Sequence, residues 1–366
     1  MKKQESILLI GSYGRGNIGD DVFLEAASSL FEGRTLYINS ANDELLPNAI
    51  KGKVQTVQTG AASGIREKLR LFAKLTHIVY WGGDLWVELY GDRFPRQSLY
   101  KMVVLNFIAR LFGKKIYYVG CGVGKLRGYS LFLARLSARL AKAIVVREER
   151  SAKLLALPHV QVLPDLAVNL PAFRTIALRE KAAKKPLKIG VSLLYYVPNP
   201  EHNFAKVVHH IKTLLTSVHP NECEIILLPM LISEQTPKDD LWALSQLQRH
   251  LKGYNVSTCK ARDINQYVEM LGELDVVIGT RLHANILATL AGIPCIGIAY
   301  RPKVLDFFKQ HGLEEWCVEF DKLSELPTVW QQFITHQPEV KQAFRKARIH
   351  LLEHQKEYEA FVDAHF

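Results

Sequence analysis

The chain has 366 residues, 48% of them hydrophobic, and a formal net charge of +11 at pH 7. This length can bury two hydrophobic cores, so two domains are expected. Its five cysteines are scattered and lack C-x-x-C spacing, which argues against a disulfide framework and against a zinc site. Only four apolar residues precede the first glycine, too few for a signal peptide, and we expect a cytoplasmic protein.

Short apolar runs alternate with amphipathic stretches along the first half of the chain. Helices are predicted at residues 20–31 and 128–142, and strands at 6–11, 34–38, 77–83, 115–120, 143–147 and 160–164. Strands that alternate with helices are typical of parallel βαβ units. Residues 1–170 are therefore predicted to form an N-terminal α/β domain.

A second series of strands follows a charged stretch bounded by prolines, which we interpret as a linker over 171–187. A C-terminal α/β domain is predicted over 188–335, and a helix that braces the two domains over 336–366. The fold class is thus α/β, with two doubly wound, Rossmann-like parallel-sheet domains facing a cleft. Ligands of such sheets bind beyond the carboxyl ends of the strands. Strands of the second domain are predicted at 187–193, 224–230, 275–279 and 294–298, and a helix at 204–215.

The loop GSYGRGNIGDD, residues 11–21, contains the G-x-G-x-x-G spacing of a dinucleotide-binding turn. Asp20 and Asp21 fall in the first turn of the following helix, where carboxylates would repel a pyrophosphate. The second predicted strand ends in Asn39 and Ser40, without an acid for a ribose diol. Both features argue against a dehydrogenase, and the glycines by themselves fit a tight strand-to-helix turn.

A second motif, GTRLHANILATLAGIPCIGIAYRPKV, begins where the strand predicted at 275–279 ends. Thr280 can cap the helix that follows, with Arg281 and His283 in its first turn. Lys303 follows the end of the next strand. Free N–H groups, a guanidinium and an imidazole together predict an anion site that contains a proton donor.

Two further stretches follow predicted strands. Gly82 and Gly83 lie in WGGDLW, where glycines would allow a ligand to approach the backbone closely. Arg147 lies in AIVVREERS, where a ligand role and an ordinary salt bridge with Glu148 or Glu149 are equally good interpretations.

In chain order, GSYGRGNIGDDVFLEA, WGG, GCGVGKL, VVREERSAKLL, PDLAV and the second motif resemble the polysaccharide pyruvyl transferase family, from residue 7 to about 305. The resemblance implies a GT-B-like fold, phosphoenolpyruvate as donor, and a cell-surface polysaccharide or its lipid-linked precursor as acceptor. The product would be a pyruvate ketal bridging two sugar hydroxyls, with release of phosphate. Asp21 replaces a common glutamate and Asp84 a frequent third glycine, departures that we expect to affect acceptor contacts.

Donor-site residues of that family carry over onto Arg147, His283 and Lys303. We predict that Arg147, Arg281 and Lys303 bind the phosphate and carboxylate of phosphoenolpyruvate. We predict His283 as the catalytic proton donor and Asp20 as the base that accepts protons from the sugar hydroxyls.

With this resemblance, we expect the N-terminal domain to form the acceptor side of the cleft and the C-terminal domain the phosphoenolpyruvate (donor) side. We predict acceptor contacts from Tyr13, Asn17, Gly19, Gly82 and Gly83. Phosphoenolpyruvate is a substrate, and neither a metal nor a further cofactor is expected.

Two alternatives stay open: a GT-B-type glycosyltransferase that uses a nucleotide sugar, and a non-catalytic partner in saccharide assembly. Residues 96–153 hold thirteen Lys or Arg against two Glu. A solvated basic face is one interpretation, and peripheral contact with an anionic membrane at its inner face is the other hypothesis. No motif that reads nucleic acid accompanies this charge.

Overall fold

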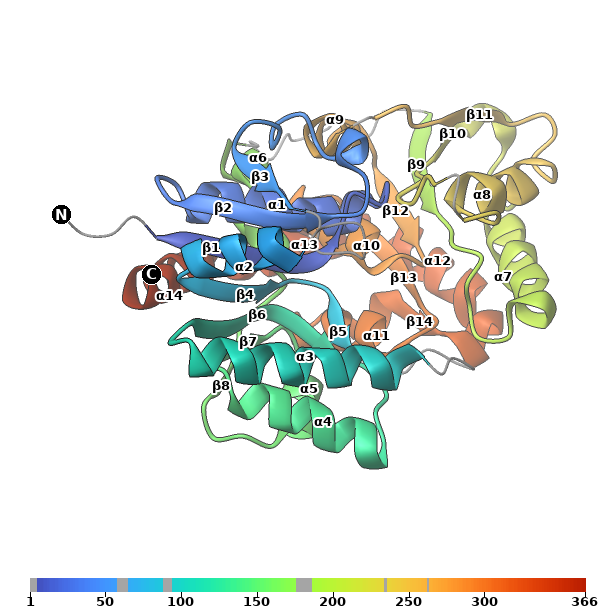
Figure 1. Cartoon of the computed structure of the whole chain (residues 1–366). Coiled ribbons are helices and arrows are strands. Elements are labelled where there is room, and N and C mark those ends of the chain that lie inside the picture. Colours follow the sequence, from blue (N-terminus) through green and yellow to red (C-terminus); the bar gives the residue numbers. More distant parts are fainter. Residues whose placement is uncertain (1–4, 58–64, 88–93, 176–185, 234–235, 262) are drawn as a thin grey trace. The chain divides into compact units, whose positions relative to one another are not determined.

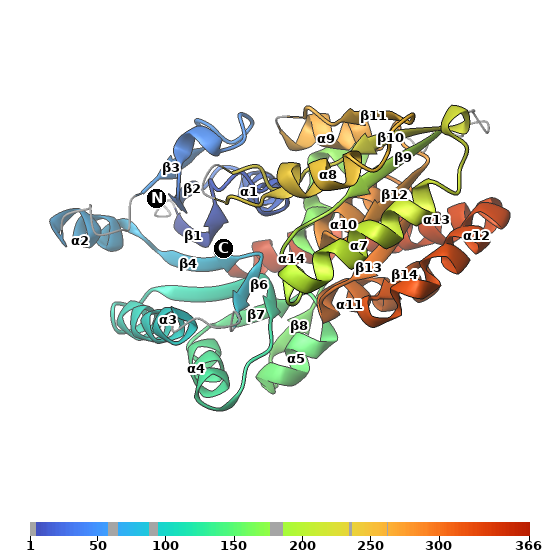
Figure 2. The same cartoon turned by 90° about the vertical axis from the view of Figure 1, so that its right-hand side faces the viewer.

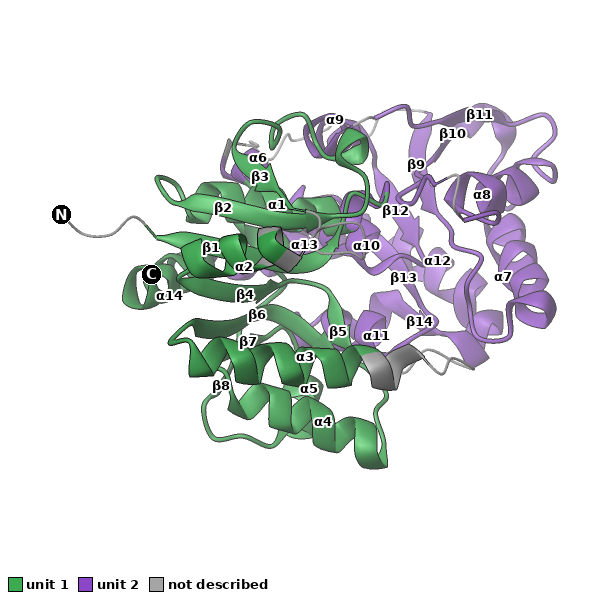
Figure 3. Cartoon of the chain, in the orientation of Figure 1, with its two compact units in different colours: residues 1–15, 20–170, 354–366 green, residues 16–19, 171–353 purple. Residues whose placement is uncertain are grey.

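Two parallel β-sheets organise the chain, one in each of two units (Figures 1 and 3). The computed structural model describes residues 5–57, 65–87, 94–175, 186–233, 236–261 and 263–366. Unit 1 comprises residues 1–15, 20–170 and 354–366, and unit 2 comprises residues 16–19 and 171–353. In the described part of the chain, no helix is long and apolar enough to cross a bilayer.

The sheet of unit 1 has the strand order β3-β2-β1-β4-β6-β7-β8, and β5 pairs with β6. Every pairing is parallel; Leu8, for example, lies opposite both Tyr37 and Ile78. The strands are β1 (Ser6–Tyr13), β2 (Thr35–Ser40), β3 (Val54–Thr56), β4 (His77–Trp81), β5 (Asp84–Trp86), β6 (Lys115–Val123), β7 (Ala143–Val146) and β8 (Val160–Val162).

Amphipathic helices cover this sheet: α1 (Ile18–Leu30), α2 (Ile65–Lys74), α3 (Phe94–Leu111), α4 (Gly128–Arg139), α5 (Glu149–Leu155) and the C-terminal α14 (Gln355–His365). Figures 1 and 2 show α3 and α4 side by side. Beneath them the rings of Tyr80 and Tyr118 stack at 4.4 Å, and Asn106 of α3 donates a hydrogen bond to the Tyr118 hydroxyl over 2.6 Å. This buried network fixes which face of α3 is turned toward the sheet.

The sheet of unit 2 has the order β11-β10-β9-β12-β13-β14. This is the doubly wound order, whose direction reverses between its first and fourth strands, here β9 and β12. Its strands are β9 (Leu187–Ser192), β10 (Cys223–Leu227), β11 (Asn255–Thr258), β12 (Val276–Gly279), β13 (Cys295–Ala299) and β14 (Cys317–Glu319). Its helices are α6 (Pro171–Thr175), α7 (Pro200–Leu215), α8 (Asp240–Gln248), α9 (Ile264–Leu271), α10 (Leu282–Leu290), α11 (Pro302–Gln310), α12 (Leu326–Thr335) and α13 (Gln337–Glu353).

The predicted α/β class with two doubly wound sheets is confirmed. The helix expected over 336–366 is divided between α13, in unit 2, and α14, in unit 1. Most of the linker expected at 171–187 lies outside the described residues, and its first five residues form α6. The domain boundaries and the bracing role of the last segment stay predictions.

Candidate functional site

The turn from β12 into α10 places His283 at the carboxyl edge of the sheet of unit 2. Arg281 precedes α10 in an extended conformation, and His283 is the second residue of the helix and half-buried. In this first turn the backbone N–H groups have no partner within the helix. The prediction that Thr280 caps the helix is wrong, because its hydroxyl accepts a hydrogen bond from Leu194 N at 3.0 Å and donates one to Ser192 O at 3.2 Å.

Asn285, which was not predicted from the sequence, stabilises this turn through hydrogen bonds of its buried side chain. Its side chain is fully buried, and Nδ2 donates to the carbonyls of Gly279 and Arg281, each at 3.1 Å. A Cβ atom on Gly279 would lie 2.5 Å from Oδ1 of Asn285, so only glycine leaves room for the amide. The backbone before His283 is therefore fixed by a buried side chain.

The first loop of the chain contributes its central residues, 16–19, to unit 2. Ile18 N donates to Met230 O at 2.8 Å, and Ile232 N donates to Gly16 O at 2.9 Å. A Cβ atom on Gly16 would lie 2.1 Å from the Ile232 carbonyl oxygen, so this approach requires glycine. The loop is thus hydrogen-bonded to the segment that follows β10.

Two predicted acceptor-side residues lie next to the predicted catalytic histidine. The side-chain oxygen of Asn17 accepts a hydrogen bond from Gly19 N at 3.1 Å, which holds the turn. A Cβ atom on Gly19 would lie only 2.4 Å from Nδ1 and 2.8 Å from Cγ of His283. Gly19 therefore packs against the imidazole, and the structure brings Asn17, Gly19 and His283 together inside unit 2.

Arg281 forms a two-pronged ion pair with Asp240 at the start of α8. Its Nε lies 3.0 Å from Oδ2, and its Nη2 contacts Oδ1. The same Oδ2 accepts hydrogen bonds from Met230 N and Leu231 N, both at 3.0 Å, and Asp240 is 1% exposed. Arg281 is thereby connected through Asp240 to Met230 and Leu231, in the segment to which the first loop is hydrogen-bonded.

Lys303 lies in the first turn of α11, which follows β13, and its side chain is partly buried. Because β12 and β13 pair in parallel, with Gly279 opposite Gly297, α10 and α11 begin at the same edge of the sheet. The predicted cation and the predicted proton donor therefore follow neighbouring strands of unit 2.

Arg147, in unit 1, is surrounded by carboxylates. Its guanidinium contacts Asp84, lies 3.1 Å from Glu148 and 3.3 Å from Asp165, and the residue is 5% exposed. Burial lowers the pKa of Arg147, but the carboxylates outweigh burial and hold this pKa above its ordinary value. The salt bridge with Glu148 that the sequence left open is present. A phosphate would have to displace acids to reach Arg147, and its donor role stays a prediction.

Tyr13 and Gly82 both make contacts in the core of unit 1. Tyr13 is 1% exposed and its hydroxyl donates to Trp81 O at 2.7 Å; burial raises its pKa above the ordinary value. Gly82 and Gly83 both have positive φ, and a Cβ atom on Gly82 would lie 2.4 Å from the Phe23 ring. These contacts give Tyr13 and Gly82 a structural role that requires no ligand.

The first turns of α1 carry three acids, Asp20, Asp21 and Glu25, of which Asp21 and Glu25 are each 7% exposed. Burial, together with the charges of Asp20 and Glu25, raises the pKa of Asp21 to about 8, against a smaller opposite effect of the backbone N–H of Gly14. The sequence pointed to Asp20 as the base. The structure adds Asp21, a carboxyl that titrates near neutrality.

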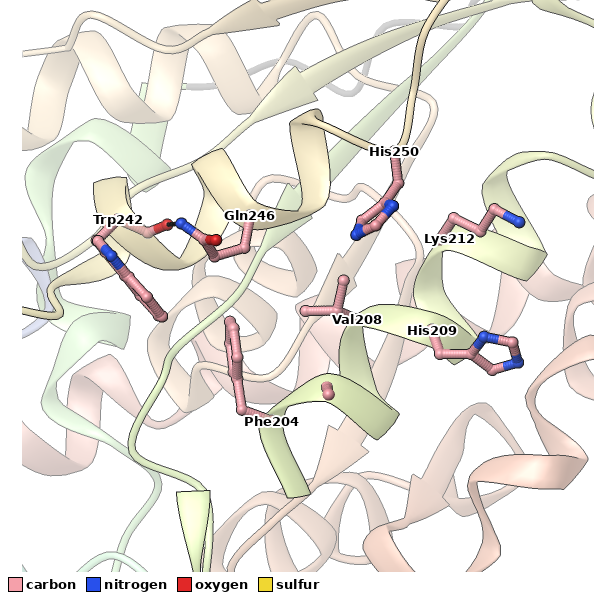
Figure 4. A pocket seen from close by; sticks show the side chains of 8 residues that line it. Phe204, Val208, His209, Lys212, Trp242, Gln246 and His250 are labelled. Atoms are coloured by element: carbon pink, nitrogen blue, oxygen red, sulfur yellow. Dashed lines mark hydrogen bonds between the residues drawn. The ribbon is translucent and has the colours of Figure 1, made fainter. Parts of the chain in front are cut away.

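A cavity of about 410 Å³ lies between α7 and α8 of unit 2 (Figure 4). The cavity is lined by Phe204, Ala205, Val208, His209, Lys212, Trp242, Gln246 and His250.

Among the residues described, no group of three or more His, Cys, Asp or Glu side chains is placed to hold a metal ion.

Solved structures with the same architecture include enzymes of the GT-B fold. The structure of HepE from Anabaena in complex with UDP has 13% identity and a TM-score of 0.63, with 99% of both chains covered. The UDP-GlcNAc 2-epimerase of Neisseria meningitidis bound to UDP-GlcNAc has 10% identity and a TM-score of 0.61, covering 99% of this chain and 100% of the other. At such low identity the likeness shows the fold, which is GT-B.

A family model described as polysaccharide pyruvyl transferase matches residues 17–302. The matched range includes the first loop from Asn17, the Arg147 cluster and the turn that carries His283. It covers well over half of the chain. The chain therefore belongs to the polysaccharide pyruvyl transferase family.

Proposed function

We propose that this protein transfers the pyruvyl group of phosphoenolpyruvate to two hydroxyls of a sugar. The acceptor is a cell-surface polysaccharide or its lipid-linked precursor, and the products are a pyruvate ketal and phosphate. Family membership supports pyruvyl transfer to a polysaccharide in general. The donor, the ketal chemistry and a cytoplasmic place of action are the finer parts of the proposal.

One observation carries the proposal. His283 lies in the first turn of α10, and its imidazole packs closely on Gly19 of the first loop. The helix N-terminus attracts an anion, and an imidazole at that end can transfer a proton to a bound anionic substrate. A tight glycine contact limits where the ring can turn. Such a fixed proton donor beside an anion site suits an enol phosphate.

The reaction needs a proton at the enol carbon while a sugar hydroxyl adds to the neighbouring carbon. Expulsion of phosphate then lets the second hydroxyl add to the same carbon. Of the two protons that the sugar loses, one ends on the new methyl group and the other leaves with phosphate, so the transfer consumes no external proton. We assign the first proton transfer to His283 and the deprotonation of the hydroxyls to Asp20.

For the donor anion, the proposal relies on Lys303 and the N–H groups at the start of α10. Arg281 acts through Asp240 as a positioning residue, because its guanidinium is already held by that carboxylate. Neither Tyr13 nor Gly82 is retained as an acceptor contact, because the core of unit 1 accounts for both.

The test is to incubate the purified chain with phosphoenolpyruvate or with UDP-sugars and to record thermal unfolding, then to assay phosphate release and ketal formation by mass spectrometry with saccharide acceptors. Phosphoenolpyruvate is expected to raise the melting temperature. His283→Ala is expected to lower turnover by about 100-fold or more, while His336→Ala, an exposed histidine of unit 2, leaves it unchanged. Stabilisation by UDP-sugars alone would favour a glycosyltransferase, and full activity of His283→Ala would refute the assignment.

A further inference from the structure

Helix α3 of unit 1 is apolar on two opposite faces. Leu99, Asn106 and Ala109 are buried against the sheet and α4. A second set of large apolar side chains is exposed, from 37% for Val104 to 69% for Leu111. The positions 100, 104, 107 and 111 repeat every three or four residues and therefore form one stripe along the helix. The exposed set is Tyr100, Val104, Phe107, Ile108 and Leu111, and Phe112 directly after the helix is exposed as well.

The neighbouring helix α4 also carries exposed apolar side chains. Tyr129 and Phe132 in its first two turns are exposed at 58% and 53%, and their rings stack at 6.2 Å. Helices α3 and α4 pack side by side (Figure 2). A monomeric soluble protein rarely gathers so many large apolar side chains on one surface without a partner. We call the exposed apolar residues of α3 and α4, with Phe112, the α3–α4 surface.

The residues of α3, of α4 and of the segment between them carry charge of a single sign. Residues 94–142 contain ten Lys or Arg and no Asp or Glu. Lys101, Arg110, Lys125, Arg127 and Arg139 are exposed on or next to the two helices. Aromatic and aliphatic side chains bordered by basic ones are the composition that enters the interface of an anionic bilayer.

The composition of the α3–α4 surface distinguishes between three possible binding partners. Two copies of the chain meeting through this surface would bring their basic residues together and repel each other. A nucleic acid would satisfy the positive charge but would leave the aliphatic stripe in water. An anionic lipid bilayer satisfies both, because its headgroups pair with the cations while its acyl region takes up Phe107 and Leu111.

We propose that the α3–α4 surface docks this protein onto an anionic lipid bilayer. The inference deepens the proposed function, since α4 follows the carboxyl end of β6, the edge at which parallel sheets bind ligands. Docking of Tyr129 and Phe132, at the start of α4, would bring that edge to the membrane surface, where a lipid-linked acceptor resides, while Phe107 and Leu111 lie toward the opposite edge, before β6 begins.

The test is co-sedimentation of the full-length chain with vesicles of phosphatidylglycerol and phosphatidylcholine in equal parts, compared with phosphatidylcholine alone. We expect binding to the anionic vesicles only, and weaker binding as salt increases. The double variant Phe107→Ser, Leu111→Ser is expected to lose binding by at least tenfold. Replacing Arg139 by Gln is expected to weaken binding about fivefold, as is typical of one basic residue near such a membrane.

Matched controls are Ile349→Ser and Lys346→Gln, which alter an exposed apolar and an exposed basic residue of α13 in unit 2; both should bind like wild type. Tyr129→Ser with Phe132→Ser gives a second, independent test of the surface. The proposal would be overturned if wild type did not bind. It would also be overturned if both double variants bound as strongly as wild type. So would a lipid-free dimer that the double variants dissociate.

Pyruvyl transfer to a water-soluble saccharide separates this proposal from the proposed function. The Phe107, Leu111 double variant should retain that activity, because neither side chain belongs to the candidate site. Loss of vesicle binding with retained transfer supports docking. Transfer absent from wild type, with vesicle binding intact, would refute the proposed function and leave the docking surface standing.

Discussion

The contact between Gly19 and His283 can be measured with Gly19→Ala alone and in a His283→Ala background. The added methyl would lie 2.4 Å from Nδ1, so the imidazole must move by about 1 Å to reach an ordinary contact distance. Such overpacking costs about 1 to 3 kcal/mol of unfolding free energy. In the His283→Ala background the methyl has room, and the cost should fall below about 0.5 kcal/mol.

Urea unfolding of the four chains gives the coupling energy directly, without reference to any activity. Gly272→Ala is the control, because Gly272 ends α9 in a right-handed helical conformation that alanine adopts readily. In the pyruvyl transfer assay, a displacement of about 1 Å should cost Gly19→Ala roughly 100-fold in turnover. An equal cost of Gly19→Ala in both backgrounds would refute the packing of Gly19 on the imidazole.

Two further substitutions test the electrostatics of each unit. Asp240→Asn leaves Arg281 without its carboxylate and should lower the unfolding free energy by about 2 to 3 kcal/mol, less than for a fully buried pair because Arg281 is partly exposed. Asp239→Asn keeps a cap on α8 and should change stability little, so equal losses for the two variants would contradict the role of the ion pair. Asp21 has a pKa of about 8 instead of 3.8, so the folded chain holds this proton more tightly than the unfolded chain. Its contribution to stability is present below about pH 4 and is lost as pH rises to about 8. Asp21→Asn, which imitates the neutral acid, should flatten this decline by about 3 kcal/mol in unfolding measured at about pH 5 and pH 8, since each pH unit between the two pKa values is worth about 1.4 kcal/mol; an unchanged pH profile would exclude a raised pKa.

Long apolar strands were predictable from the sequence, and so was the short edge strand β8, but the short edge strands β3 and β14 were not. Runs such as SILLI and AIVV carry enough consecutive apolar residues to indicate a strand buried on both faces. β3 and β14 have three residues each, at the edges of their sheets. A strand this short shows no hydrophobic period, and only its pairing partner defines it.

At the candidate site, the sequence indicated which side chains follow strand ends but not what they pair with. His283 and Lys303 were predicted from their position after β12 and β13. Asp240 lies 41 positions before its partner Arg281, a distance at which spacing carries no information. The only local signal was the doublet Asp239-Asp240, in which Asp239 alone supplies the helix cap.

Helix α14 makes completion of unit 1 dependent on residues that are synthesised after unit 2. Tyr358 donates to the carbonyl of Pro164 at 2.6 Å, and the ring of Phe366 packs on Phe31 at 4.9 Å. A ribosome synthesises residues 354–366 only after all of unit 2 has been made. The first 170 residues therefore emerge with all eight strands but with the apolar surface under α14 uncovered, and a chain truncated after Glu353 would keep that surface open to chaperones and proteases.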